Sequence, residues 1–359
     1  MADSVQIKQF KLADQDALLA FLRVAYSDEP RKSDIDFWRW HYLENPYAAP
    51  DDIPLWVVYS GRRIVGQLAT IPVELKVGSD NKRAIWILDF VILPQYRGQG
   101  LGKRLVLTAR ESFPVMLTLG INDQSTAVFR SLKWVALGGV HRYHKLLYPG
   151  DAFGEFSKIE PLRKLINLSY SPFRPSYERI AITHGHEVRE VTTFGADFED
   201  LWQRAGAQWP CAIVRSPDYL AWQFSRQPSK KFNVLGLYRH DRLVGYVVLF
   251  FRKDEGRGVP PKAAISDLCY DAGDSPQVID DLLKAALQLA LDKRAGSLVT
   301  DILDSAVEAR LKGLGFWRIK SAPQFMASTL EHEDLIYQGS NWFLTRGDSD
   351  VSIFEQPNL

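Results

Sequence analysis

Cysteine is almost missing from this chain, because only Cys211 and Cys269 occur among its 359 residues. Two distant cysteines supply neither a disulfide framework nor the cysteine-rich spacing of a zinc site. We therefore expect a reduced, cytoplasmic protein that holds no metal.

The chain also lacks an excess of charge of either sign. Its 44 Lys and Arg residues oppose 43 Asp and Glu residues, which gives a formal net charge of +1, and no block of basic residues stands out. Proteins that bind nucleic acid through phosphate neutralisation need such a block. We expect no nucleic-acid partner and a small or neutral ligand instead.

Long hydrophobic runs are absent too. The longest, around Ala84–Leu93, is far shorter than a membrane span and contains Asp89. The first residues lack the basic and then apolar layout of a signal peptide. The sequence therefore predicts no membrane partner and a cytoplasmic location.

An internal repeat organises the chain, whose length suggests two domains of roughly 150 residues each. Asp36-Phe-Trp-Arg-Trp-His-Tyr-Leu-Glu-Asn-Pro46 recurs as Asp218-Tyr-Leu-Ala-Trp-Gln-Phe-Ser-Arg-Gln-Pro228, so that Trp222 stands 182 positions after Trp40. Three further pairs follow in the same order: Arg63–Gly66 with Arg242–Gly245, Ile87–Asp89 with Ile265–Asp267, and Leu132–Trp134 with Leu314–Phe316.

Hydrophobic periodicity predicts a similar order of strands and helices in each half. In the first half we expect strands at Val5–Phe10, Trp56–Tyr59, Ile64–Val73, Ala84–Leu93, Val115–Leu119 and Val135–His144, and helices at Ala13–Tyr26, Asp36–Tyr42, Leu101–Ser112 and Ser125–Leu132. In the second half we expect strands at Asn233–Leu237, Leu243–Arg252, Ala263–Tyr270 and Ser297–Ile302, helices at Pro276–Lys293 and Ser305–Leu314, and a last strand, Trp342–Arg346, that closes the second sheet.

The segment from Asp89 to Lys103 carries the clearest chemical signal. A buried strand gives way to a turn with Gly98, Gly100 and Gly102, and an amphipathic helix follows at once. Glycines let consecutive backbone N–H groups converge on an anion, and the N-terminus of a helix adds partial positive charge. The spacing fits neither a Walker loop nor a dinucleotide fingerprint. A plain glycine turn is the alternative to a diphosphate cradle.

Arg97-x-x-Gly100-x-Gly102, preceded by Asp89 and by Val91-Ile92-x-Pro94, resembles the acyl-CoA signature of the GNAT acetyltransferase superfamily. The resemblance covers the first half through Asn122 and the helix after it. It implies acetyl-CoA, or another acyl-CoA, as co-substrate. It also implies the binding residues: Phe90, Val91 and Ile92 for the pantetheine arm, Arg97, Gly98, Gln99, Gly100, Leu101, Gly102 and Lys103 for the diphosphate, and Asn122 for the arm.

The second half has lost this loop. Cys269-Tyr-Asp-Ala-Gly-Asp-Ser-Pro-Gln277 has one glycine and no arginine, and Asp271 and Asp274 would repel a diphosphate. This half either shapes the pocket of the acyl acceptor or serves only as a structural buttress. We predict an α/β protein with mixed sheets in two tandem GNAT-like domains, divided into 1–148 with the acyl-CoA site, a linker at 149–186, a degenerate domain at 187–348 and a tail at 349–359.

The expected reaction is direct attack of an amine on the thioester, which requires a base and a proton donor. The resemblance implies a Tyr acid where this chain has Phe129, and a Glu base on Val115–Leu119, which has no acid. Asp89 and, less directly, Glu74 are the candidate bases, and Tyr143 and Tyr96 are the candidate proton donors. Asp267, which matches Asp89 in the half without the loop, favours a structural role for both.

Other chemistry-bearing residues leave their alternatives open. His184, His186, His141 and His144 lack the neighbours of a metal site, and neither cysteine has a flanking His that would activate it for acyl transfer. Phe37, Trp38, Trp40 and Tyr42 either border the acceptor or pack in the core.

The function predicted from the sequence is therefore N-acetylation of a small molecule that bears an amine, with an amino sugar of glycan biosynthesis as one candidate. A non-catalytic protein that binds or senses acyl-CoA is an alternative from another class. An aminoacyl transferase of the FemAB type shares the doubled fold, but the intact phosphate loop favours coenzyme A.

Overall fold

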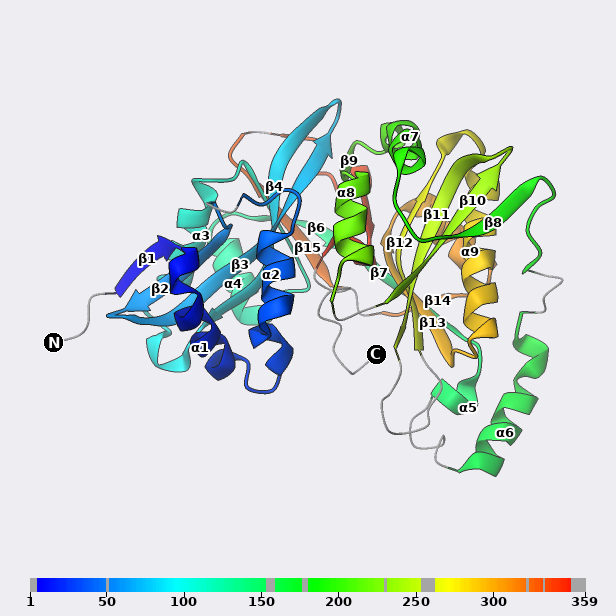
Figure 1. Cartoon of the computed structure of the whole chain (residues 1–359), viewed down its shortest axis with the longest axis horizontal. Helices are drawn as coiled ribbons and strands as arrows, with labels where there is room; N and C mark the ends of the chain where they lie inside the picture. The colour runs from blue at the N-terminus through cyan, green and yellow to red at the C-terminus, as the bar shows by residue number, and fades with distance from the viewer. Residues whose placement is uncertain are drawn as a thin grey trace.

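A computed structural model describes residues 5–49, 52–152, 159–175, 180–228, 231–252, 262–320, 323–331 and 333–349. Its two halves lie side by side, and helices cover the sheets of both (Figure 1). The strands form one hydrogen-bonded path in the order β6-β15-β5-β4-β3-β9-β16-β13-β12-β11-β10-β8, and β1, β2, β7 and β14 pair beside it.

The first half supplies the elements β1 (Val5–Gln9), α1 (Gln15–Ala25), α2 (Ile35–Leu43), β2 (Leu55–Ser60), β3 (Arg63–Val77), β4 (Asp80–Ile92), α3 (Leu101–Arg110), β5 (Val115–Leu119), α4 (Asp123–Ser131), β6 (Val135–Gly139) and β7 (His141–Leu146). The connecting segment contains α5 (Pro149–Ala152) and α6 (Glu160–Ser169).

The second half supplies β8 (His186–Val191), α7 (Ala196–Ala205), β9 (Cys211–Ile213), α8 (Pro217–Leu220) with a π-helical turn after it at Ala221–Ser225, β10 (Phe232–Arg239), β11 (Arg242–Arg252), β12 (Lys262–Tyr270), α9 (Ser275–Asp292), β13 (Ser297–Leu303), α10 (Ser305–Gly313), β14 (Trp317–Arg318), β15 (Gln324–Thr329) and β16 (Trp342–Thr345).

The repeat extends to the residues that begin the helices. The side chain of Asp34 caps α2 and that of Ser216 caps α8, each by accepting a hydrogen bond from a backbone N–H of the first turn. In the same way Asn122 caps α4 and Asp304 caps α10. Each pair of caps is 182 positions apart. Because such caps stabilise a helix by about 1 kcal/mol, the repeat preserves local folding signals as well as core residues.

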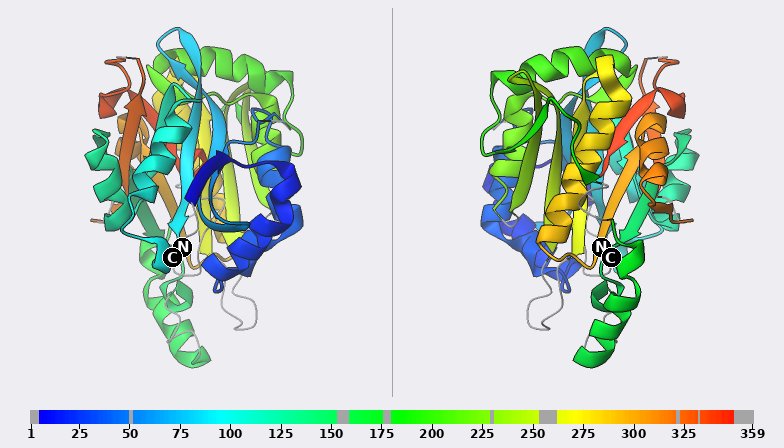
Figure 2. Two further views of the ribbon diagram at one scale, coloured as in Figure 1. Left: turned by 90° about the vertical axis from the view of Figure 1, so that its left-hand side faces the viewer. Right: turned by 90° about the vertical axis from the view of Figure 1, so that its right-hand side faces the viewer.

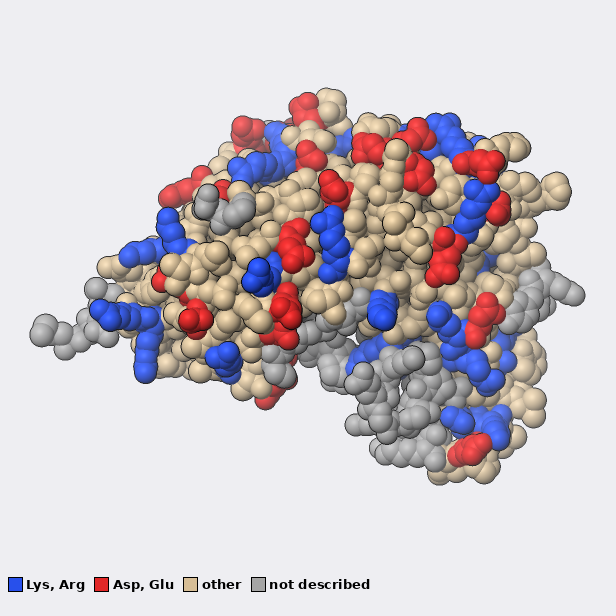
Figure 3. Space-filling model, in the orientation of Figure 1, with Lys and Arg blue, Asp and Glu red and all other residues tan. Residues whose placement is uncertain are grey.

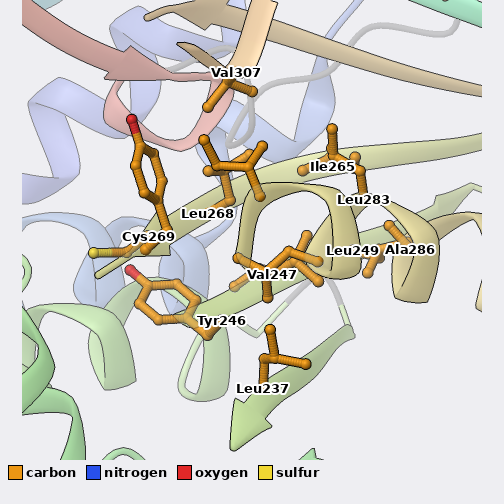
Figure 4. Packing of buried hydrophobic residues seen from close by; sticks show 14 of the residues in the cluster. Leu237, Tyr246, Val247, Leu249, Ile265, Leu268, Cys269, Leu283, Ala286 and Val307 are labelled. Carbon is orange, nitrogen blue, oxygen red and sulfur yellow. The ribbon is translucent and has the colours of Figure 1, made fainter. Parts of the chain in front are cut away.

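Apolar side chains fill the space between helices and strands on both faces of the first half. One cluster joins α1 and α2 to the sheet through Leu18, Trp38 and Leu55, and another joins α3 to the opposite face through Leu105, Ile85 and Met116. The second half has one larger core, in which side chains of α9 meet those of β11 and β12 (Figure 4). Each half therefore has enough buried apolar surface for an interior of its own.

The predicted strand Val135–His144 is wrong, because the structure breaks it at Val140 into β6 and β7. Gly138 has φ +109°, and a second glycine follows it, so an uninterrupted ladder is unfavourable here. The strand β6 stays in the first sheet beside β15, whereas β7 leaves it and pairs with β13 and β14 of the second half.

The exchange is reciprocal. β15, from the second half, enters the first sheet between β5 and β6, with Phe325 opposite Leu119 and Ala327 opposite Leu117. β7 lies against β13, with Tyr143 opposite Thr300. Each half therefore completes its sheet with a strand of the other half. The predicted last strand also differs in role. β16 pairs with both β13 and β9, and β9 pairs in turn with β3 of the first half, so β16 links the two sheets rather than closing the second.

The two tryptophans of the repeat meet at the contact between the halves. The rings of Trp40 and Trp222 stack with centroids 4.9 Å apart and an interplanar angle of 11°. Each indole Nε1 donates a hydrogen bond of 2.9 Å to the carbonyl oxygen of the other tryptophan. Reciprocal contacts of this kind are the mark of a local twofold axis.

The aromatic stripe on α2 belongs to the core. Phe37, Trp38, Trp40 and Tyr42 are all buried, which decides between the two alternatives that the sequence left open. On the molecular face in Figure 3, Lys and Arg are interspersed with Asp and Glu. Within the described ranges, no helix combines the length and the apolar character that crossing a bilayer requires.

We predict that Trp40→Phe lowers the free energy of unfolding by about 1–3 kcal/mol, because it removes a buried hydrogen bond to a carbonyl oxygen of the other half. Urea denaturation followed by fluorescence measures the change. Trp317→Phe is the matched control, since this side chain is 42% exposed, and it should stay within about 0.5 kcal/mol of the parent. Equal losses in the two variants would contradict the role of the stacked pair.

Candidate functional site

The turn between β4 and α3 depends on glycine for two different reasons. Gly98 and Gly100 have φ of +77° and +71°, in the left-handed region, and a Cβ on either would meet nothing within 4 Å. Backbone conformation alone therefore requires glycine at these two positions. A Cβ on Gly102 would lie 2.8 Å from Cζ of Phe90, so this glycine lets α3 pack closely on β4.

The charged residues of this turn are exposed at its rim. The Nε of Arg97 donates to the carbonyl oxygen of Ile92 at 2.9 Å, which ties the turn back to the end of β4. Lys103 lies in the first turn of α3, where the backbone N–H groups have no partner within the helix. Full and partial positive charges thus gather at one place, which favours an anion.

An open cavity of about 430 Å³ lies over this turn, between the beginnings of α3 and α4. Of the residues predicted to bind the cofactor, all but Gln99 line it; Gln99 lies on the exposed turn between Gly98 and Gly100. Three further lining residues that no sequence motif predicted, Gln124, Ser125 and Val128, follow Asn122 on α4. The complete lining is Phe90, Val91, Ile92, Tyr96, Arg97, Gly98, Gly100, Leu101, Gly102, Lys103, Asn122, Gln124, Ser125 and Val128.

The strands β4 and β5 diverge beside this cavity. Their parallel pairing runs only from Ala84 to Ile87 on β4 and from Val115 to Thr118 on β5. Beyond it, Leu88–Ile92 pairs with β3 on one edge, and no strand in the described ranges pairs with its other edge. Backbone N–H and C=O groups on that edge are therefore available to an extended ligand.

Asp89 adjoins the cavity residue Phe90 but does not line the cavity. Its Oδ1 accepts a hydrogen bond of 2.5 Å from Nζ of Lys32, which also lies 3.6 Å from Glu29. Burial, followed by the charge of Asp89, raises the pKa of Tyr26 well above its usual range. The carboxylate of Asp89 is thus paired with a cation from the segment before α2.

The second half contains a matching ion pair. Nη2 of Arg215 lies 3.0 Å from Asp267, the counterpart of Asp89, and 2.8 Å from Asp348. The hydroxyl of Tyr246 donates to the other oxygen of Asp267 at 2.7 Å. Because the same arrangement recurs where the phosphate loop is missing, it is typical of a structural ion pair.

The other two predicted catalytic residues lie elsewhere. Glu74 is opposite Arg83 on β4, whereas Gly66 is opposite Ile92. Glu74 lies eight positions after Gly66, a separation of roughly 26 Å along β3. Tyr143 is fully buried on the exchanged strand β7, where its hydroxyl donates to Glu308 at 2.7 Å. The structure therefore separates both residues from the cavity.

Phe129 occupies the position at which the family resemblance implies a tyrosine acid, and the core encloses it. Phe129 is fully buried, and its ring lies 5.8 Å from that of Phe90 and 4.6 Å from that of Trp134. All five residues of β5 are buried too, and none carries a carboxylate. Of the tyrosines that we proposed as proton donors, Tyr96 lines the cavity and Tyr143 does not.

The surroundings of the cysteines do not favour acyl transfer through a thiolate, and those of the histidines do not favour metal binding. Burial raises the pKa of the Cys211 and Cys269 thiols to about 12, so neither forms a thiolate at neutral pH. His141 contacts Glu308, and His186 contacts Asp281. Within the described residues, no group of three or more His, Cys, Asp or Glu side chains is placed to hold a metal.

Comparisons with known proteins agree with this geometry. Residues 16–132 match the family described as Acetyltransferase (GNAT) family. Among solved structures, the chain is similar to a GCN5-related N-acetyltransferase from Anabaena variabilis, with a TM-score of 0.62 and 13% identity over 91% of this chain and 73% of that one.

A probable N-acyltransferase from Enterococcus faecalis gives a TM-score of 0.61 and 12% identity over 91% of this chain and 73% of that one. The N-myristoyltransferase of Saccharomyces cerevisiae, solved with myristoyl-CoA, gives a TM-score of 0.61 and 12% identity over 92% of this chain and 81% of that one. At these identities the likeness concerns the fold, and the predicted α/β architecture of two GNAT-like units in tandem is confirmed. A search of curated proteins finds no match.

Burial of His41 in α2 predicts a specific pH dependence. Burial lowers its pKa to about 3, whereas an unfolded histidine titrates near 6.5. As pH falls below about 6.5, the unfolded chain takes up a proton that the folded chain excludes. This one group should therefore reduce stability by up to about 1.4 kcal/mol per pH unit until the folded pKa is reached.

The measurement is an NMR titration of the His41 ring from pH 8 to pH 4, in which we expect the neutral form throughout. A midpoint near 6.5 in the folded protein would contradict the predicted burial.

Proposed function

We propose that this chain, whose residues 16–132 match the GNAT family of acetyltransferases, transfers an acetyl or longer acyl group from acyl-CoA to the amine of a small molecule. One observation carries this proposal above the others: a single cavity is bounded by a glycine turn, a helix N-terminus and an open strand edge. Few other ligands need all three at once.

The residues that line the cavity suit two parts of the donor, its diphosphate and its pantetheine arm. The backbone N–H groups from Gly98 to Lys103, with the Arg97 and Lys103 side chains, would hold the diphosphate. The open edge of β4 at Phe90–Ile92 would pair with the amide groups of the pantetheine arm, and Asn122 would contact the arm from α4. The donor supplies an activated thioester, which an uncharged amine attacks.

Direct transfer is favoured over an acyl-enzyme, because both cysteines are buried and their pKa is raised to about 12. Of Asp89, Glu74 and Tyr143, only Asp89 adjoins the strand segment Phe90–Ile92 that would bind the donor, and it is our candidate base. Tyr96 is our candidate donor of a proton to the departing sulfur, since it lines the same cavity.

The domain division is a proposal as well. We assign donor binding to 1–148 and treat 149–186 as the connection and 187–348 as the unit without a donor site. The exchanged strands β7 and β15 cross this division, and the tail beyond residue 349 lies outside the described residues. An amino sugar as acceptor and a cytoplasmic location remain hypotheses.

A protein that binds acyl-CoA without turnover is the second candidate. The buried ring of Phe129 and the absence of any acid on β5 favour it, because both positions lack the groups that commonly move protons in this family. An aminoacyl transferase of the FemAB type is disfavoured by the phosphate loop.

We predict that Gly102→Ala weakens coenzyme A binding at least tenfold, because the new Cβ would meet the ring of Phe90 and push α3 away from β4. Isothermal titration calorimetry with coenzyme A measures the loss. Gly313→Ala in α10 is the matched control, since its Cβ would meet nothing within 4 Å and alanine favours helix. Undiminished affinity in Gly102→Ala, or no binding by the parent protein, would contradict the proposed site.

The cysteines provide a further test of direct transfer. A thiol reagent should label neither Cys211 nor Cys269 in the folded protein and both in denaturant, because folding shields both thiols. The same reagent then reports free coenzyme A without background when acetyl-CoA is incubated with a panel of amines. Mass spectrometry that finds an acylated cysteine during turnover would refute direct transfer, and binding without thiol release would favour the sensor.

A further inference from the structure

A second and larger cavity, of about 790 Å³, lies on the other side of α4. Its described lining is Gly120, Ile121, Asp123, Thr126, Ala127, Arg130, Arg142, Ile319, Pro323 and Gln324. The helix α4 forms a wall between the two cavities, since Asn122 and Val128 line the first and Asp123, Ala127 and Arg130 line the second.

The two halves build this cavity together. Gly120 and Ile121 follow β5 of the first half, whereas Pro323 and Gln324 come from the beginning of β15. Backbone hydrogen bonds hold the walls in place. The N–H of Gly120 donates to the carbonyl oxygen of Gln324 at 3.1 Å, and the N–H of Ile319 donates to the carbonyl oxygen of Arg142 at 2.9 Å. Since Arg142 lies on the exchanged strand β7, neither half forms the cavity alone.

Positive charge predominates on one side of the cavity. Arg142 binds Asp301 through two hydrogen bonds of 2.7 and 3.1 Å, and Arg346 contacts the same carboxylate from the interior. The described lining holds two guanidinium groups, those of Arg130 and Arg142, and one carboxylate. Arg130 is exposed near the end of α4, and no ion pair to it is found among the described residues. This corner therefore suits an anionic group, and Arg binds carboxylate and phosphate especially well.

Asp123 is the single carboxylate in the described lining, and it lies next to Asn122 of the donor cavity. The cavity begins after the end of β5, at Gly120 and Ile121, and extends along α4 to Arg130. A ligand with a positive group at Asp123 and a negative group at Arg130 and Arg142 would match these charges.

We propose that this cavity binds the acyl acceptor, and that the acceptor carries a phosphate or carboxylate in addition to its amine. The inference rests on the proposed function. In the transfer, the amine nitrogen forms the amide bond as the C–S bond breaks, and the proton that the amine loses ends on the departing sulfur. Amine and thioester thus give amide and thiol.

This assignment gives the second half a role that its sequence alone leaves open. The half has no phosphate loop, yet it supplies Ile319, Pro323 and Gln324 and holds β7 with Arg142 in place. Acceptor recognition is thus divided between the halves, and the donor is bound by the first half alone.

The test compares two amines that differ by one phosphate. Isothermal titration calorimetry measures glucosamine and glucosamine 6-phosphate binding to the protein saturated with coenzyme A. We expect the phosphorylated amine to bind at least tenfold more tightly, and Arg130→Gln to remove most of this preference. Arg23→Gln, which changes an exposed arginine of α1 outside both cavities, should preserve it.

Each outcome decides the inference. Equal affinity for both amines, or a preference that survives Arg130→Gln, would overturn it. If inorganic phosphate displaces glucosamine 6-phosphate and that amine is never acetylated while others are, the cavity is an effector site and the acceptor assignment is wrong. Failure to bind coenzyme A would refute the proposed function, while the same titration without coenzyme A would still show whether Arg130 selects the anion.

Discussion

The reciprocal exchange of β7 and β15 is the constraint on which the rest of the molecule depends. Each sheet lacks a strand that only the other half supplies, so separating the halves would leave buried backbone groups unpaired in both. The stacked pair of Trp40 and Trp222 adds two buried hydrogen bonds across the same contact. The halves are therefore held in one fixed arrangement, which a simple linker between two domains would not impose.

This arrangement fixes the end of β5, after which α4 begins and separates the two cavities. Because β15 pairs with β5 along its whole length, the residues that follow β5 have a firm support on one side. On the other side β4 turns away from β5 after Ile87 and exposes its backbone edge. A strand that is paired on one side beside a strand with an open edge would let an extended ligand, such as the proposed donor, bind without displacing a strand. The beginning of α4 lies between the first cavity and the second.

Local patterns predicted much of this fold, and the residues they proposed for donor binding lie close together. The glycine turn, the flanking charges and Asn122 are short-range features, and the structure gathers them around one cavity. The pairing of β7 is different, because alternation within a strand does not specify which sheet it joins. Gly138 and Gly139 marked the break, but the direction after it depends on contacts with residues about 160 positions later. For this reason the sequence did not predict that Tyr143, on β7, lies away from the cavity. Glu74 also lies away from the cavity, because β3 extends beyond the predicted apolar run and places this residue at the far end of the hairpin.

The paired carboxylates Asp89 and Asp267 show how duplication separates structure from chemistry. In the second half, Arg215, Thr345 and Tyr246 surround Asp267, whose side chain is only 4% exposed. A buried charge with this many partners is costly to disturb and serves the fold. In the first half, the side chain of Asp89 is 15% exposed, accepts a hydrogen bond from Lys32 and lies beside Tyr26. The carboxylate of Asp89 thus keeps more contact with solvent than that of Asp267. This difference supports the proposal that Asp89, rather than its buried counterpart, takes part in the chemistry.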